Sequence, residues 1–323
     1  LADGTTLGLY RGTATINGTL EMGSSSVLTT GTKVALTVAS GGEITGDGHL
    51  RLDSGTVTLT EPMTLPSVEI KGGSLVANDD LSVGVLHLIA GGLSGAGDVT
   101  VTETLEWDGV TNMSGEGTTI IAAGATATLG TTRIYLWGGR TLTNYGTLTQ
   151  SGDGRIMVGG RGATSTITNA AGAQWTVALD ANKIIAYGSE PYTTVNFVNE
   201  GTLTKSSAGT NILGGSPGAL NLTNSGVLEV NTGTLQLLGG TAELGSPGTV
   251  RLTTDGSITP MVRSGELTIA GSLEVILAEG YTPANGTTVR LIGYGSRSGD
   301  FGTITPPQGR TVAETYESDG LDV

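Results

Sequence analysis

Two histidines, His49 and His87, are the only imidazoles in a chain of 323 residues that contains no cysteine. A Ser-His-Asp site needs one imidazole as its general base, yet no Gly-x-Ser-x-Gly turn accompanies either histidine. His49 follows the turn-like Gly46-Asp-Gly48, and His87 lies in the alternating segment Val85-Leu-His-Leu88. We therefore expect both to be outward-pointing strand residues. A metal site at either would need ligands from neighbouring repeats, so the sequence assigns no metal ligand.

Carboxylates are the second group that could carry chemistry, because a glycosidase requires two acids at a defined separation. Asn78-Asp-Asp80 contains the only adjacent pair, and the other acids are scattered singly, mostly in turn-like segments. Asp and Asn commonly bond to nearby backbone in turns, so we interpret Asp79 and Asp80 as turn residues. The sequence predicts no catalytic residue and no cofactor, and hence not an enzyme.

Tryptophan is the third candidate, because an exposed indole can stack on a sugar ring. The three tryptophans lie in the middle third of the chain and are candidate glycan contacts: Trp107, Trp137 and Trp175. Buried, the same side chains would only fill wide parts of a core. The sequence leaves both interpretations open.

A recurring phrase indicates how the chain is organised. It consists of Asn, a glycine within two positions and then alternating apolar and small residues, as in Asn17-Gly-Thr-Leu20, Asn144-Tyr-Gly-Thr-Leu148, Asn199-Glu-Gly-Thr-Leu203 and Asn224-Ser-Gly-Val-Leu228. Imperfect repetition of this kind is typical of solenoids, in which each unit buries its apolar face against its neighbours. Asparagines at equivalent places in successive coils can form a hydrogen-bonded ladder. We therefore assign a structural turn or ladder role to Asn144, Asn199, Asn224, Gly146, Gly201 and Gly226.

Composition supports a thin, repetitive core. The chain has 55 glycines, 37% hydrophobic residues and only 4% aromatics, whereas a thick globular core uses more large side chains. Period-two alternation, as in Thr56-Val-Thr-Leu-Thr60, predicts short strands, and helical periodicity is nearly absent. The net charge of -14 argues against nucleic-acid partners, because phosphates require a basic surface.

These patterns predict an all-β protein, a right-handed parallel β-helix with about 20 to 25 residues per coil. We place its repeats in residues 1–271. The stretch 272–323 differs, with Phe301 and a Pro306-Pro307 break, and is predicted to be an atypical C-terminal β capping or connecting unit. No run of 18 apolar residues exists, so we expect no transmembrane helix.

The C-terminal stretch also carries a resemblance. Gly280-Tyr-Thr-Pro283, Gly295-Ser-Arg-Ser-Gly-Asp-Phe301 and Gly320-Leu-Asp-Val323 resemble the terminal unit of large bacterial surface-exposed β-helix proteins. Upstream, Met113-Ser-Gly-Glu-Gly117 and Gly139-Arg-Thr-Leu-Thr-Asn144 are similar to the repeats of autotransporter-passenger-like and filamentous-haemagglutinin-like proteins. The resemblance implies a secreted or cell-surface solenoid, and it carries over no catalytic residue.

Together, the residues and the resemblance predict a non-catalytic extracellular structural protein, either a cell-surface spacer or adhesin or a filament-forming subunit. Unpaired strand edges at the ends of a solenoid can pair with another copy, and Leu1–Tyr10 shows no charged or helical cap, so we expect self-association. Surface glycans are the other expected partners. The alternative is a polysaccharide-binding or polysaccharide-cleaving β-helix. Export would place the targeting segment outside residues 1–323.

Overall fold

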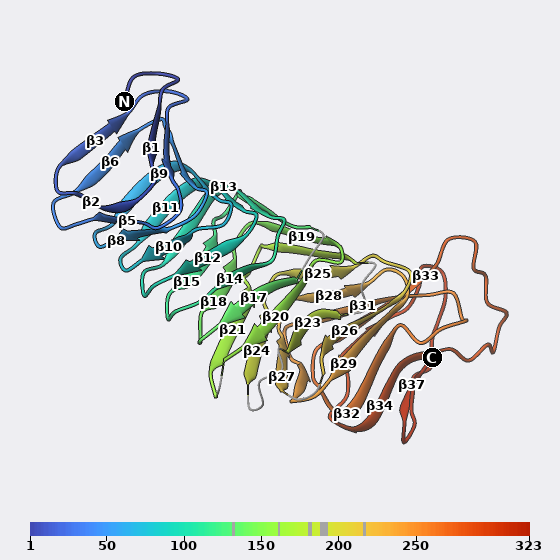
Figure 1. Cartoon of the computed structure of the whole chain (residues 1–323). Coiled ribbons are helices and arrows are strands. Elements are labelled where there is room, and N and C mark those ends of the chain that lie inside the picture. The colour runs from blue at the N-terminus through green and yellow to red at the C-terminus, as the bar shows by residue number, and fades with distance from the viewer. Residues whose placement is uncertain (131–132, 161, 180–182, 188–192, 216–217) are drawn as a thin grey trace. The chain divides into compact units, whose positions relative to one another are not determined.

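The structure is a computed structural model that describes residues 1–130, 133–160, 162–179, 183–187, 193–215 and 218–323. Within these ranges every regular element is a strand, and the chain divides into two compact units, Leu1–Leu148 and Thr149–Val323. Both units wind as parallel coils of short strands (Figure 1). The predicted all-β parallel β-helix is confirmed.

In the first unit each coil contributes to three stacks of parallel strands. Stack A contains the strands that later position the candidate site, including the second halves of three long strands, β9 (Met63–Ile70), β11 (Leu81–Leu88) and β13 (Val99–Trp107). Its other members are β1 (Thr6–Leu9), β4 (Val27–Thr30), β7 (His49–Leu52) and β16 (Thr126–Leu129).

Stack B is built of strands that do not share a continuous element with either neighbour. It comprises β2 (Gly12–Ile16), β5 (Val34–Val38), β8 (Thr56–Leu59), β10 (Ser74–Ala77), β12 (Gly91–Ser94), β14 (Thr111–Met113) and β17 (Arg133–Trp137). Stack C is formed by the first halves of β9, β11 and β13 with β15 (Thr118–Ile121) and β18 (Thr141–Asn144). β3 (Thr19–Met22) and β6 (Glu43–Gly46) form a separate two-stranded sheet on this side.

Two prolines account for the break between β6 and β9. The amide of Met63 donates to the carbonyl of Asp80 in the next coil, at 2.9 Å. Amides alternate in direction along a strand, so the nitrogens of Pro62 and Pro66 lie on the opposite side, toward β6. Proline has no N–H to donate, which removes the ladder hydrogen bonds there.

The second unit repeats the three-stack arrangement. One stack contains β22 (Gln174–Leu179), β25 (Thr202–Lys205), β28 (Val227–Val230), β31 (Thr249–Thr254), β33 (Ser272–Leu277) and β35 (Thr303–Thr305). A second contains β21 (Thr164–Asn169), β24 (Thr194–Asn199), β27 (Ala219–Asn224), β30 (Ala242–Leu244) and the later part of β32 (Met261–Ile269). The third contains β20 (Arg155–Gly159), β23 (Lys183–Tyr187), β26 (Thr210–Gly214), β29 (Thr234–Leu238) and the start of β32. The strand β19 (Thr147–Gly152) spans the division between the units.

The C-terminal stretch combines both pairing modes. β33 and β35 continue the parallel stacking, and β34 (Arg290–Ser298) pairs in parallel with β32. Antiparallel pairing appears where β37 (Gly320–Asp322) joins β34 and β36 (Thr315–Tyr316). Arg290 stabilises this join through ion pairs with Asp322 and, at 3.0 Å, with Asp319.

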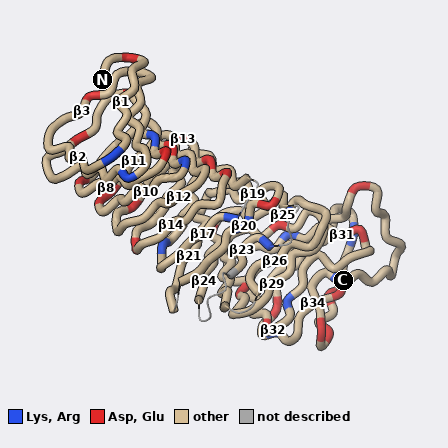
Figure 2. Tube along the Cα trace, in the orientation of Figure 1, with Lys and Arg blue, Asp and Glu red and all other residues tan. Residues whose placement is uncertain are grey.

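The core consists of rows of apolar side chains in register from coil to coil. Alternation along each short strand turns one residue inward and the next outward, so the same strand position is buried in every coil. One such row in each unit, each member at most 2% exposed, is Leu28, Leu50, Val68, Leu86 and Leu105 in the first and Leu203, Leu228, Val250 and Leu273 in the second. The outer faces carry few charges along most of the trace (Figure 2).

Buried cations bond to backbone carbonyls inside this frame. Arg140 donates to the hydroxyl of Thr119 at 3.0 Å, and Arg263 donates to the carbonyls of Gly239 and Gly240, both at 2.6 Å. Burial lowers the pKa of Arg140 to about 10 and also lowers the pKa of Arg263. The carbonyl bonds stabilise charges that would otherwise be costly to bury.

Candidate functional site

The candidate site lies on the outer face of stack A, where three successive coils present polar side chains at one strand position. Glu69 on β9, His87 on β11 and Glu106 on β13 are in register. The residues on either side of each are buried apolar ones, such as Leu86 and Leu88 beside His87. Alternation therefore forces all three polar side chains outward, in a line along the stack.

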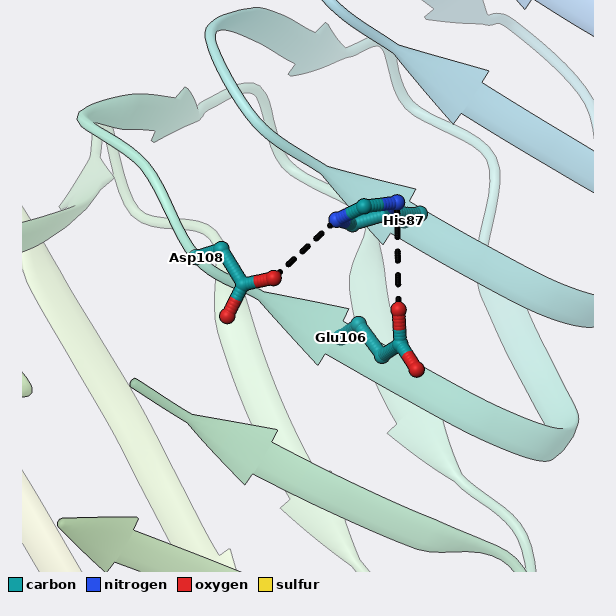
Figure 3. A group of neighbouring side chains, drawn as sticks. All are labelled: His87, Glu106 and Asp108. Atoms are coloured by element: carbon teal, nitrogen blue, oxygen red, sulfur yellow. Dashed lines mark hydrogen bonds and ion pairs between the residues drawn. The ribbon is translucent and has the colours of Figure 1, made fainter. Parts of the chain in front are cut away.

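Asp108 completes the site from the residue after β13. His87 Nε2 lies 3.1 Å from Asp108 Oδ2, while its Nδ1 lies 3.8 Å from both Glu69 Oε1 and Glu106 Oε2. Figure 3 shows the imidazole between the carboxylates of Glu106 and Asp108. One ligand atom from each of these three residues lies within 4.8 Å of the others. Three carboxylates thus surround one imidazole.

The site is accessible but anchored. The side chains of His87 and Glu69 are 26% and 31% exposed, and those of Glu106 and Asp108 are 49% and 53% exposed. Lys71 Nζ is 3.9 Å from Glu69 Oε1, so a cation already faces that carboxylate. One coil earlier, Arg51 occupies the register position next to Glu69. The histidine end of the row is therefore better fixed than its two outer acids.

The second unit contains a ladder of the same kind with a different central residue. Glu229, Arg251 and Glu274 are in register on β28, β31 and β33. Arg251 Nε lies 2.7 Å from Glu274, and its Nη1 lies 3.6 Å from Glu229. The hydrogen bond to Glu274 is the main reason that the pKa of Arg251 is raised. Here a permanent cation separates the two carboxylates.

The predicted asparagines lie at the ends of strands and are fully buried. In the second unit Asn169 Nδ2 donates to Asn199 Oδ1 at 2.8 Å, and Asn199 Nδ2 donates to Asn224 Oδ1 at 2.6 Å. Asn199 Nδ2 also donates to the carbonyl of Val227 at 2.9 Å. In the first unit Asn144 Oδ1 accepts from the amide of Gly146, at 3.1 Å. Sequence reading missed Asn169, although it too follows an alternating strand and precedes small residues.

The predicted glycines are required for space. A Cβ at Gly146 would lie 2.2 Å from the carbonyl oxygen of Ala125, one at Gly201 would lie 2.4 Å from that of Ala170, and one at Gly226 would lie 2.2 Å from that of Gly201. None of these three has the positive φ that we expected of turn glycines. The turn of one coil sits directly on the backbone of the previous coil, which leaves no room for a side chain.

The tryptophans divide into two buried residues and one on the outer face. Trp107 and Trp175 are each 1% exposed, so neither indole can stack on a sugar, which corrects the prediction for these two residues. Trp175 donates to Gln150 Oε1 at 2.8 Å and packs edge-on against Phe197. Trp137 is half-buried beside Tyr135, with the two rings nearly parallel and their centroids 5.9 Å apart.

The histidine cluster was not found from the sequence because the coil period varies. His87 follows Glu69 by 18 residues and precedes Glu106 by 19, whereas we expected 20 to 25. In the second unit Asn224 follows Asn199 by 25 residues, and Asn199 follows Asn169 by 30. The usable signal was an apolar-x-apolar frame at the shorter spacing: Val68-Glu-Ile70, Leu86-His-Leu88 and Leu105-Glu-Trp107.

No protein-family model, curated protein or solved structure matches this chain. The fold defines the class, a parallel β-helix, and the resemblance to secreted surface proteins stays a prediction. Over the residues that the structure describes, no helix has the length and apolar character needed to cross a membrane.

Proposed function

We propose that the chain is a non-catalytic structural β-solenoid that works outside the cell or at the cell surface, as a spacer, an adhesin or a filament subunit. The observation that carries this proposal is the burial of apolar rows in register, coil after coil, in each unit. Such a frame holds its surface residues at fixed intervals without needing a thick core. The absence of cysteine and the net charge of -14 support export of a soluble protein.

The hollow at the C-terminal loops supports a non-catalytic role. It encloses about 1020 Å³ between residues 283–289 and 307–313. Its described lining includes Arg310, which donates to the carbonyl of Pro283 at 2.8 Å, but contains no Asp, Glu or His. Acid–base chemistry there would lack the paired groups that it requires.

Self-association is the second part of the proposal. The first-coil strands β1, β2 and β3 pair with β4, β5 and β6, and no partner strand is recorded on their other edge in the part of the chain that the structure covers. Tyr10 beside this edge is 69% exposed. A free edge of parallel strands is a template for another strand, so a second copy can extend the stack.

Polysaccharide binding is the alternative function, and one pair of side chains favours it. Tyr135 and Trp137 point outward from β17, because Ile134 and Leu136 between and beside them are fully buried. Neighbouring aromatic rings on an outer face can stack on sugars. This candidate rests on Trp137 alone among the three tryptophans.

Sedimentation velocity over a wide concentration range tests the structural proposal, together with a glycan array and a reducing-sugar assay. We expect concentration-dependent growth and no release of reducing ends. Monomers at every concentration would refute self-association. Sugar release abolished by one carboxylate substitution would refute the non-catalytic assignment. A glycan signal lost in Trp137→Ala and kept in Tyr145→Ala, an exposed aromatic elsewhere in the same unit, would favour the alternative.

A further inference from the structure

We propose that the outer face of stack A binds one divalent transition-metal cation, with Zn²⁺ the best match, through His87, Glu106 and Asp108. The residues come from two adjacent coils, and their ligand atoms already lie within 4.8 Å of one another. Glu69, from the preceding coil, completes the surroundings of the imidazole. This cation site goes beyond the structural role proposed above and stands or falls separately from it.

The donor set selects the class of cation. Zn²⁺ is bound by histidine nitrogen at about 2.0–2.1 Å and by carboxylate oxygen at about 2.0–2.2 Å, with three protein ligands sufficient when water fills the remaining position. Ca²⁺ prefers six to eight oxygen ligands, and Mg²⁺ prefers oxygen and water. An imidazole between two carboxylates therefore favours Zn²⁺ and its transition-metal neighbours over Ca²⁺ and Mg²⁺.

The geometry needs only small side-chain movements. His87 Nε2 and Asp108 Oδ2 are 3.1 Å apart, a separation that two ligands of one metal ion commonly have. Glu106 is 49% exposed, so its carboxylate is free of close packing and can rotate toward the ion. The backbone of both coils is fixed by the parallel ladder between β11 and β13.

Glu69 would act as the outer-shell partner. With Nε2 on the metal, the remaining ring proton lies on Nδ1, which faces Glu69 Oε1 at 3.8 Å. A carboxylate that accepts this proton orients the imidazole and strengthens it as a ligand. Lys71, 3.9 Å from the same Glu69 oxygen, fixes that carboxylate in turn.

The ladder of the second unit shows what this position requires electrostatically. There Arg251 places a permanent positive charge between Glu229 and Glu274. In the first unit the corresponding centre is His87, while Glu69, Glu106 and Asp108 bring three carboxylates to it. A bound dication would supply positive charge at the place where Arg251 supplies it in the second unit.

Isothermal titration of tag-free protein with ZnCl₂ tests the proposal, and Co²⁺ absorption in the visible range reports the ligand field. We expect one site per chain. His87→Arg copies the Glu-Arg-Glu arrangement of the second unit, so it should fold and yet lose the site. Glu106→Gln should weaken binding at least as much as the roughly 10–100-fold that loss of an outer-shell partner costs.

His49→Gln is the matched control, because it removes the other histidine, which is exposed on β7 of the same stack. It should bind Zn²⁺ as the unmodified protein does. Absence of Zn²⁺ binding, binding retained in His87→Arg, or binding of Ca²⁺ and Mg²⁺ only would each overturn the proposal. Circular dichroism and thermal unfolding of each variant establish that a lost signal is not lost folding.

Discussion

Replacing Asn199 with alanine should destabilise the second unit strongly. The side chain is fully buried, accepts one hydrogen bond from Asn169 and donates to Asn224 and to the carbonyl of Val227. At about 1 kcal/mol net for each hydrogen bond, the loss is about 3 kcal/mol. Asn224 Oδ1 is also left without its donor in a buried place, which adds about 1–3 kcal/mol. We therefore expect a loss of about 4–6 kcal/mol, measured by equilibrium urea unfolding.

The same strand provides the control. Asn196 Oδ1 accepts from Asn221 Nδ2 at 3.0 Å, so it is also part of an asparagine pair between adjacent coils, but it is only half-buried and faces outward. Water can replace that bond, so Asn196→Ala should cost no more than about 1 kcal/mol. Equal losses for Asn196→Ala and Asn199→Ala would refute the reasoning, because burial would then not decide the contribution.

Two further perturbations test the packing of the coils and a buried charge. Gly201→Ala places a Cβ 2.4 Å from the carbonyl oxygen of Ala170 and should cost about 1–3 kcal/mol in urea unfolding, whereas Gly209→Ala, with nothing within 4 Å of its Cβ, should be neutral or stabilising; the reverse order would contradict the space argument. Burial lowers the pKa of Lys205 to about 8, below its unfolded value near 10.5, so the folded state releases this proton first. Stability should therefore rise between pH 8 and 10, by at most about 1.4 kcal/mol per pH unit, and Lys205→Met should reduce that slope; identical slopes would show that Lys205 is not the source.

The sequence predicted the fold class well because the solenoid signal is local and repeated. Asn144, Asn199 and Asn224 each follow an alternating strand, and the structure places all three at buried strand ends. The glycines that follow were recognised as essential for a different reason from the one that holds. A close approach between coils, such as Gly226 over the carbonyl of Gly201, depends on a neighbour that single-sequence reading does not place.

The candidate site was beyond the sequence for a related reason. Glu69, His87 and Glu106 look like isolated polar residues, because 18 or 19 residues separate each from the next. Only the coil period brings them together, and an error of a few residues in that period moves every side chain to a different partner. The interior position of Trp107 and Trp175 was likewise undecided, since an indole suits both a core and a sugar surface.

The stacking of coils in parallel register is the central claim, and engineered disulfides test it directly in this cysteine-free chain. Adjacent coils lie about 4.8 Å apart, within the range that a disulfide spans. The register pairs Thr58 with Val76 in the first unit and Thr176 with Thr204 in the second, all on the outer face. We predict that double-cysteine variants at both pairs oxidise readily, and that Thr58→Cys with Ser94→Cys, two coils apart, does not. Failure of the register pairs to cross-link, or equal cross-linking of the control pair, would contradict the stacked-coil structure.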